Sequence, residues 1–168
     1  MPLVYLTGTS GVGKTTVGQE LSRRGFTVYD VDVDGLARWY ENASGAEVPM
    51  PDDRDDRWYA EHTYRLPPET VRRLTPAVGI TFISGTVGNE DEIWDLFDQV
   101  VHLTADPATL ERRLRARGSF GSSAEERARV LGWQAQADLD NARYGARLVS
   151  ADAPPAQVAE WVLEVVGG

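Results

Sequence analysis

The chain alternates short apolar runs with longer stretches in which apolar residues recur at helical spacing. The runs are rich in β-branched and aromatic residues, which is typical of buried strands. We expect strands over residues 3–7, 26–29, 78–84, 100–104 and 147–150. Strands that alternate with helices predict a parallel sheet covered on both faces, and therefore a three-layer α/β/α sandwich with five parallel strands.

Helix boundaries are marked by capping residues and by Gly and Pro. The signals are Gly25 after a helix over 13–24, capping boxes at Asn89 and Ser123 for helices over 89–97 and 123–141, Asp106 with Pro107 for a helix over 106–115, and Pro154 or Pro155 at the start of the last helix.

Residues 36–76 do not follow this pattern. We expect a helical stretch over 35–42, a Gly-, Pro- and acid-rich loop over 43–56, and short helices over 57–66 and 69–75. The segment is interpreted as a helical, acceptor-binding insert at the edge of one domain that spans residues 1–168.

Composition excludes several classes of function. The formal net charge of −9 argues against a general nucleic-acid surface, because the phosphate backbone would be repelled. With no cysteine, disulfides, thiolate metal sites and a cysteine nucleophile are excluded. No apolar run approaches the ~18 residues of a membrane span and no signal peptide is recognisable, so a cytoplasmic protein without membrane contact is expected. Of the 17 basic residues, the sole lysine is Lys14.

That lysine belongs to the motif with the clearest chemistry. Residues 8–15 read G-T-S-G-V-G-K-T and match G-x-x-x-x-G-K-[ST] in full. The glycines let backbone N–H groups converge on phosphate, Lys14 reaches the outer phosphates, and the Thr15 hydroxyl can ligate Mg²⁺. The expected nucleotide-binding residues are Gly8, Thr9, Ser10, Gly11, Val12, Gly13, Lys14, Thr15 and Thr16.

Asp30 and Asp32 form a D-x-D pair at the end of the second strand. The carboxyl ends of parallel strands line the binding site in such folds. One carboxylate could hold a Mg²⁺-bound water, and the other could accept the proton of a hydroxyl group. The alternative is that both acids cap the following helix.

Arginines crowd the end of the helix expected over 106–115. Arg113 and Arg117 lie four residues apart and share a face. In so acidic a chain, this cluster suggests a clamp on the phosphates of a bound nucleotide. For Arg112 and Arg115 a solvated helix face is the simpler interpretation.

These residues together resemble the small P-loop kinases, namely shikimate kinase, gluconate kinase and adenylate kinase. The loop followed by V-Y-D-V-D at 28–32 resembles the start of shikimate kinase, and R-L-x-x-R at 113–117 is similar to the adenylate kinase lid. Bacterial ATP-binding proteins of this kinase type share a segment like I-S-G-T-V-G-N at 83–89.

The resemblance implies a set of roles. It implies that Asp30 assists Mg²⁺ together with Thr15, and that Asp32 contacts the acceptor hydroxyl. It also implies that Arg113 stacks on adenine, that Arg117 in a short lid over 117–127 touches phosphate, and that Pro154 lies beside the nucleotide base. Lys14, Asp30, Asp32 and Arg117 would then be the catalytic residues.

The acceptor is expected between the D-x-D pair, the insert and the turn after the third strand. The candidates that would bind it are Asp32, Arg38, Arg57, Arg65, Gly85 and Asn89, and the aromatic residues Trp39, Trp58 and Tyr59 could stack on a ring. Several arginines near one site would favour an anionic acceptor.

The sequence therefore predicts a kinase that transfers the γ-phosphoryl group of Mg·ATP to a small molecule, either a hydroxyl metabolite or a nucleoside or nucleotide. The protein would act as a monomer or homodimer. A regulatory or slow ATPase module remains an alternative, as does a polynucleotide 5′-hydroxyl kinase, although an acidic chain is ill suited to a strand-binding groove. A guanine-reading N-K-x-D motif is impossible because Lys14 is the only lysine.

Overall fold

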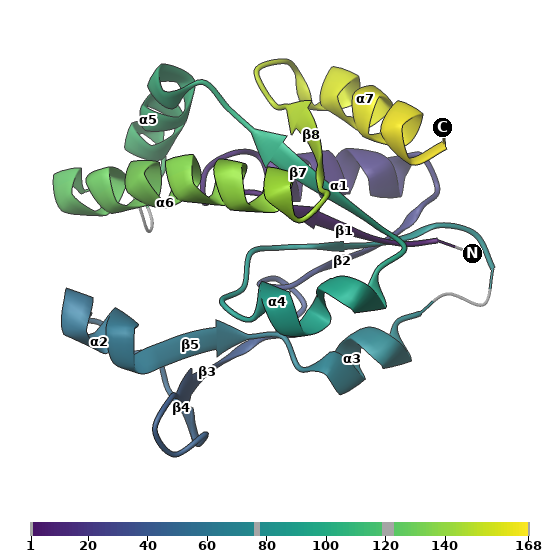
Figure 1. Ribbon diagram of the computed structural model, residues 1–168. Helices are drawn as coiled ribbons and strands as arrows, with labels where there is room; N and C mark the ends of the chain where they lie inside the picture. The colour runs from purple at the N-terminus through teal and green to yellow at the C-terminus, as the bar shows by residue number, and fades with distance from the viewer. Residues whose placement is uncertain (1, 76–77, 119–122, 168) are drawn as a thin grey trace.

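The computed structural model describes residues 2–75, 78–118 and 123–167, and its central element is a parallel sheet (Figure 1). The five strands run in the order β2-β6-β1-β7-β8, and every neighbouring pair is parallel. They are β1 (Leu3–Thr7), β2 (Thr27–Asp30), β6 (Thr81–Ser84), β7 (Gln99–Thr104) and β8 (Arg147–Ser150). The five-stranded parallel sheet expected from the apolar runs is confirmed.

Helices cover both faces of this sheet because alternate side chains of each strand point to opposite sides. From β1, Val4 and Leu6 enter one core with residues of α1 (Lys14–Arg23), α5 (Pro107–Ala116) and α7 (Pro155–Gly167). Leu3 and Tyr5 enter the other core. This second core also takes residues of α3 (Pro68–Arg73) and α4 (Glu90–Ile93), and the long helix α6 (Ala124–Arg143) packs beside β7.

The insert is a small antiparallel sheet with helices, which corrects the helical expectation. β3 (Arg38–Glu41) lies between β4 (Glu47–Val48) and β5 (His62–Arg65), and α2 (Asp56–Glu61) precedes β5. The helix expected over 35–42 is therefore wrong, and the helix expected over 57–66 is confirmed only as far as Glu61, where α2 ends and β5 begins. Aromatic side chains pair across the strands, with the rings of Trp39 and Tyr64 5.3 Å apart, and such pairs stabilise sheets.

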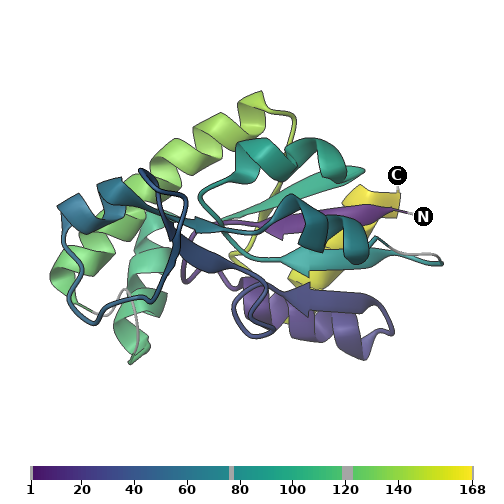
Figure 2. The same ribbon diagram turned by 90° about the horizontal axis from the view of Figure 1, so that it is seen from below.

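Two neighbouring residues join the insert to the main sheet. The Gly88 N–H donates to the Tyr64 carbonyl at 2.7 Å. The Asn89 amide accepts from the Leu66 N–H at 2.9 Å and donates to the Leu66 carbonyl at 3.1 Å. These bonds hold β5 beside the carboxyl edge of the sheet, and Figure 2 shows the insert at the opposite end of the molecule from the two termini.

Because these bonds engage the Asn89 side chain, the capping box predicted there is wrong, whereas the caps predicted at Ser123 and Asp106 are confirmed. The Asn89 side chain makes no cap bond to α4, which is followed at once by the 3-10 turn η1 (Trp94–Leu96). Ser123 does cap α6, accepting from the Glu126 N–H at 3.2 Å, and Asp106 caps α5. The lid expected over 117–127 includes residues 119–122, which lie outside the described residues.

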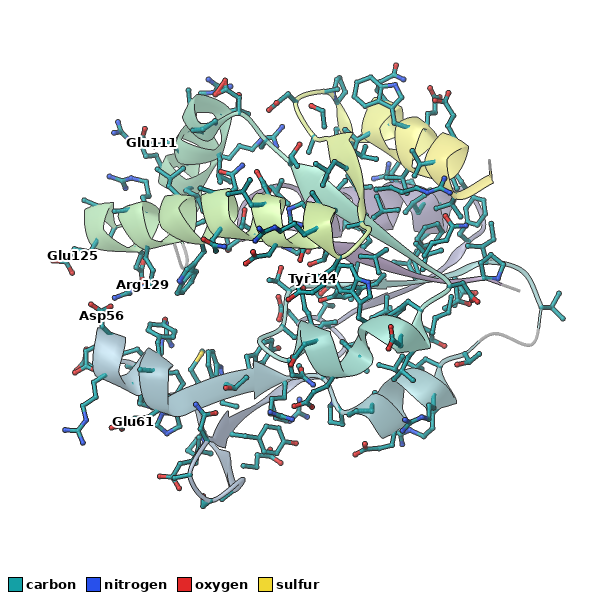
Figure 3. The ribbon with its side chains drawn as sticks, viewed as in Figure 1. Asp56, Glu61, Glu111, Glu125, Arg129 and Tyr144 are labelled. Atoms are coloured by element: carbon teal, nitrogen blue, oxygen red, sulfur yellow. The ribbon has the colours of Figure 1, made fainter. Side chains whose placement is uncertain are left out.

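The insert also contacts α6. Arg129 pairs with Asp56, and its guanidinium lies 5.0 Å from the centre of the Tyr59 ring. Figure 3 shows Arg129 and Asp56 turned toward one another from the two helices. The Tyr59 ring meets the Trp133 ring edge-on at 5.7 Å. No helix within residues 2–75, 78–118 and 123–167 is both long enough and apolar enough to cross a membrane.

Candidate active site

The loop between β1 and α1 has the backbone shape that its glycines allow. Gly8 and Gly11 have φ angles of 147° and 84°, in the region that favours glycine. A Cβ atom at Gly8 would lie 2.7 Å from the Leu103 carbonyl oxygen. Within the described residues, the Thr9 hydroxyl is buried without a hydrogen-bond partner. The loop thus offers backbone N–H groups and a buried hydroxyl next to the start of α1.

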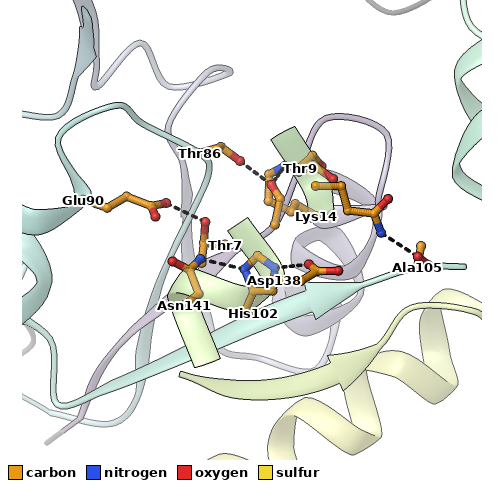
Figure 4. Close-up of polar contacts among 11 residues, drawn as sticks. Thr7, Thr9, Lys14, Thr86, Glu90, His102, Ala105, Asp138 and Asn141 are labelled. Carbon is orange, nitrogen blue, oxygen red and sulfur yellow. Dashed lines mark hydrogen bonds and ion pairs between the residues drawn. The ribbon is translucent and has the colours of Figure 1, made fainter. Parts of the chain in front are cut away.

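Lys14 is folded against this loop. Its Nζ donates to the carbonyl oxygens of Gly8 at 2.5 Å and Thr9 at 3.0 Å, and Figure 4 places it among these polar contacts. Burial of the ammonium lowers the pKa of Lys14 to about 8, although the nearby carboxylates of Asp32 and Asp30 oppose that shift. A buried cation with carbonyl partners can exchange them for phosphate oxygens.

Thr15 and Asp30 lie together, as the metal prediction requires. The Thr15 hydroxyl donates to Asp30 Oδ2 at 2.8 Å. The other oxygen, Asp30 Oδ1, accepts from the N–H groups of Asp32 and Val33 at 3.0 and 3.1 Å, which fixes the carboxylate. A hydroxyl and a carboxylate are hard oxygen ligands of the kind that Mg²⁺ takes alongside water and substrate phosphates.

These two side chains suit a metal ion whose remaining ligands come from the substrate and water. In the part of the chain that the structure describes, no group of three or more His, Cys, Asp or Glu side chains could hold a metal ion. Mg²⁺ commonly uses one or two protein carboxylates together with phosphates, so Thr15 and Asp30 fit such an ion.

Asp32 is partnered by a residue that the sequence analysis missed. The Tyr64 hydroxyl donates to Asp32 Oδ1 at 2.8 Å, and burial together with Asp32 raises the pKa of Tyr64 well above its usual value. Tyr64 belongs to β5, a segment that was expected to be helical. The alternating polar and aromatic residues of H-T-Y-R at 62–65 are the signal that could have revealed the strand.

The two arginines that share a face of α5 reach the phosphate loop. Arg113 donates to the Val12 carbonyl at 2.9 Å and to the Ala151 carbonyl at 2.8 Å, which ties the loop to the segment before Pro154. Arg117 donates to the Ser10 hydroxyl at 3.1 Å. Arg112 and Arg115 instead contact Thr109 and Glu111 of their own helix. Thr16 is exposed on the first turn of α1, and Pro154 is exposed before α7.

The expected acceptor-binding arginines have protein partners. Arg38 donates to the carbonyls of Gly35 and Ala37, Arg57 pairs with Glu61, and Arg65 pairs with Glu92 at the edge of the insert.

Gly85 and Asn89, which were also expected to bind the acceptor, are instead packed against or bonded to other parts of the chain. A Cβ atom at Gly85 would lie 2.5 Å from the Val31 Cβ, so the residue after β6 packs closely against the turn after β2. Asn89 is 1% exposed and joins the insert to the main sheet.

A third carboxylate belongs to the site, and it was interpreted only as part of a capping box. Glu90 Oε1 accepts from the Thr7 hydroxyl at 2.7 Å (Figure 4). It also accepts from the Tyr5 hydroxyl at 2.9 Å. Thr7 immediately precedes the phosphate loop, and the negative charge of Glu90 raises the pKa of Lys14, against the effect of burial. Burial and Glu90 together raise the pKa of Tyr5.

A parallel sheet in the order β2-β6-β1-β7-β8, with residues 8–15 forming a phosphate loop between β1 and α1, defines a P-loop nucleotide-binding fold. A family model described as an AAA domain matches residues 4–131, and the chain belongs to this family. No curated protein matches the chain in sequence.

Solved structures of small P-loop kinases share the fold. Shikimate kinase from Acinetobacter baumannii in complex with shikimate is 18% identical with a TM-score of 0.64, covering 99% of this chain and 93% of that one. Shikimate kinase from Bacteroides thetaiotaomicron is 18% identical with a TM-score of 0.60, covering 99% of each chain. A gluconokinase from Sinorhizobium meliloti 1021 is 18% identical with a TM-score of 0.59, covering 99% of this chain and 91% of that one. The expected resemblance to small P-loop kinases is confirmed.

Proposed function

We propose that this protein transfers the γ-phosphoryl group of Mg·ATP to a hydroxyl group of a small molecule. The observation that carries the proposal is the position of Lys14, which lies on the phosphate loop and within the fields of Asp30 and Asp32. One of these carboxylates is bonded to the Thr15 hydroxyl and the other to the Tyr64 hydroxyl. A metal-assisting acid and a separate acid for the acceptor are the pair that phosphoryl transfer to a hydroxyl requires.

In this proposal the donor side binds and neutralises phosphate. The N–H groups of the loop and Lys14 hold the outer phosphates, Thr15 and Asp30 hold the metal, and Arg117 stabilises charge on the transferred group. A bound Mg²⁺ would offset the negative charge of the phosphates. Arg113 and the segment that ends at Pro154 border the nucleotide base.

On the acceptor side, Asp32 acts as the base. As the acceptor oxygen bonds to the γ-phosphorus, the bond from that phosphorus to the oxygen that bridges it to the β-phosphate breaks, and ADP leaves with that electron pair. The hydroxyl proton passes to Asp32. The Tyr64 hydroxyl occupies Asp32 Oδ1, and within the described residues nothing bonds Oδ2, which is the oxygen we assign to the acceptor.

The test is to incubate the protein with γ-labelled ATP, Mg²⁺ and fractionated pools of small metabolites. Label should move to a small molecule. Lys14→Ala should abolish nucleotide binding, whereas Asp32→Asn should keep ATP binding and lower transfer about 10²- to 10⁴-fold, as expected for loss of a general base.

Glu164→Gln on the exposed face of α7 serves as the control and should match the unmodified protein. If label appears only as free phosphate across all pools, the protein is an ATPase and the kinase proposal is wrong. Tight ATP binding by Lys14→Ala would contradict the assignment of the phosphate loop itself.

A further inference from the structure

A groove of about 440 Å³ lies between the α4–η1 segment and the C-terminal half of α6. The described residues that line it are Val87, Gly88, Glu90, Asp91, Trp94, Asp95, Trp133, Gln136, Ala137, Asp140, Asn141 and Tyr144. Figure 3 shows Tyr144 at the end of α6, above α4. This volume is within the range of small-molecule sites.

The inner end of the groove borders the phosphate site. Glu90 lines the groove and accepts hydrogen bonds from Tyr5 and Thr7 through Oε1. Its charge also favours the protonated form of Lys14. Within the described residues, nothing bonds its Oε2. Asp32 does not line the groove, but Asp32 and Glu90 both raise the pKa of Lys14, so both carboxylates face the same cation. A ligand that contacts Glu90 could therefore extend its hydroxyl group out of the groove toward Asp32 and the phosphate loop.

The rest of the polar lining is also negative. Besides Glu90, the groove presents the carboxylates of Asp91, Asp95 and Asp140, and none of its described lining residues is Lys, Arg or His. An anion would be repelled from such a surface, whereas a cation would be attracted.

Aromatic rings supply the apolar walls. The rings of Trp94 and Tyr144 lie 5.8 Å apart at 56° to one another, and the third ring is that of Trp133. Trp133 and Tyr144 expose 45% and 68% of their surface. Aromatic faces combined with carboxylates are the environment in which ammonium groups bind, because the ring quadrupole attracts a cation.

One residue of the groove lining, Asn141, is buried and hydrogen-bonded to the main sheet. Asn141 is 5% exposed, and its amide nitrogen lies 2.9 Å from His102 Nδ1. His102 Nε2 lies 2.7 Å from Asp138 Oδ1, so His102 of β7 holds both Asp138 and Asn141 of α6 (Figure 4). A preorganised surface loses less entropy when it binds a ligand.

We propose that this groove is the acceptor subsite and that it takes a hydroxylated small molecule bearing a protonated amine or a quaternary ammonium group. The inference rests on the proposed kinase function for the hydroxyl group, but not for the cation. It replaces the anionic acceptor expected from the sequence, since Arg38, Arg57 and Arg65 are engaged with carbonyls or acids.

Binding to the full chain can test the charge preference separately from catalysis. The probes are three small alcohols of similar shape: choline, its uncharged isostere neohexyl alcohol, and the anion hydroxypivalate. Ligand-observed NMR titrations should show that choline binds about tenfold more tightly than neohexyl alcohol, as expected for a cation over aromatic rings and carboxylates. Hydroxypivalate should bind most weakly.

Two variants locate the binding. Glu90→Gln keeps an oxygen for Tyr5 and Thr7 but removes the charge, so it should weaken choline about three- to tenfold and leave neohexyl alcohol unchanged. Trp94→Leu should weaken choline to a similar extent. Glu164→Gln removes an equal charge from α7 and should have no effect. Equal affinity for the three alcohols, or choline binding that neither groove variant alters, would overturn the inference.

The same probes with γ-labelled ATP separate this inference from the kinase proposal. Transfer to choline in preference to the other two alcohols supports both. Transfer that favours hydroxypivalate overturns the cationic groove and supports the kinase. Groove-dependent choline binding with no label transferred to any alcohol or metabolite pool supports the groove and overturns the kinase.

Discussion

Lys14 is the residue on which the nucleotide site depends, and its surroundings make its charge sensitive to pH. Its ammonium is partly buried against the carbonyls of Gly8 and Thr9, and burial lowers its pKa to about 8. Below that pH the side chain is a cation that can pair with phosphate. Above it the free protein holds a neutral amine, which must gain a proton before it can do so.

We therefore expect ATP affinity to fall as pH rises through about 8. Once proton uptake is required, the dissociation constant should rise by up to about tenfold per pH unit, since binding is coupled to one proton. Titration calorimetry between neutral and alkaline pH would measure this rise. Lys14→Arg, whose side chain stays charged over this range, should show no such slope, and an equal slope in that variant would assign the titration to another group.

Two glycines, Gly85 and Gly132, differ in how much space surrounds them. At the end of β6, Gly85 leaves no room for a side chain, because a Cβ atom would lie 2.5 Å from the Val31 Cβ and 2.6 Å from Val31 Cγ2. In the interior of α6, Gly132 has open space around it. The first allows β6 and the turn after β2 to pack closely, whereas the second only weakens a helix.

Alanine at these two positions should change stability in opposite directions. Gly85→Ala should lower the free energy of unfolding by about 1–3 kcal/mol through overpacking against Val31. Gly132→Ala should raise it by about 0.5–1 kcal/mol, because alanine loses less backbone entropy in a helix. Urea unfolding followed by circular dichroism would measure both. Stability unchanged by Gly85→Ala would show that Val31 can move aside.

At the scale of the whole molecule, two sheets must be held at a fixed distance for donor and acceptor to meet. Asn89 makes the connection, since its buried amide bonds both the N–H and the carbonyl of Leu66. Tyr64 lies two residues before Leu66 and holds Asp32. The position of the proposed base relative to Lys14 therefore depends on contacts between the insert and the main sheet.

Asn89→Ala should lower the free energy of unfolding by about 1–3 kcal/mol, because two backbone groups of Leu66 lose their buried partner. It should also weaken transfer more than ATP binding, because Asp32 belongs to the acceptor side. Asn42→Ala is the matched control, since Asn42 is exposed and bonds Thr63 and Ala60 within the insert. An equal loss of stability in both variants would contradict the special role of Asn89.

Sequence alone determined the features that depend on local chemistry. The apolar runs predicted the parallel strands, the pattern from Gly8 to Thr15 predicted the phosphate loop, and Ser123 predicted the start of α6, because each signal lies within a few neighbouring residues. The tertiary structure decided how the insert is assembled, since β3 pairs antiparallel with β5 across a long loop. It likewise brought Tyr64 to Asp32 and Glu90 to Thr7. Such contacts join residues far apart in the chain, so no local pattern could reveal them.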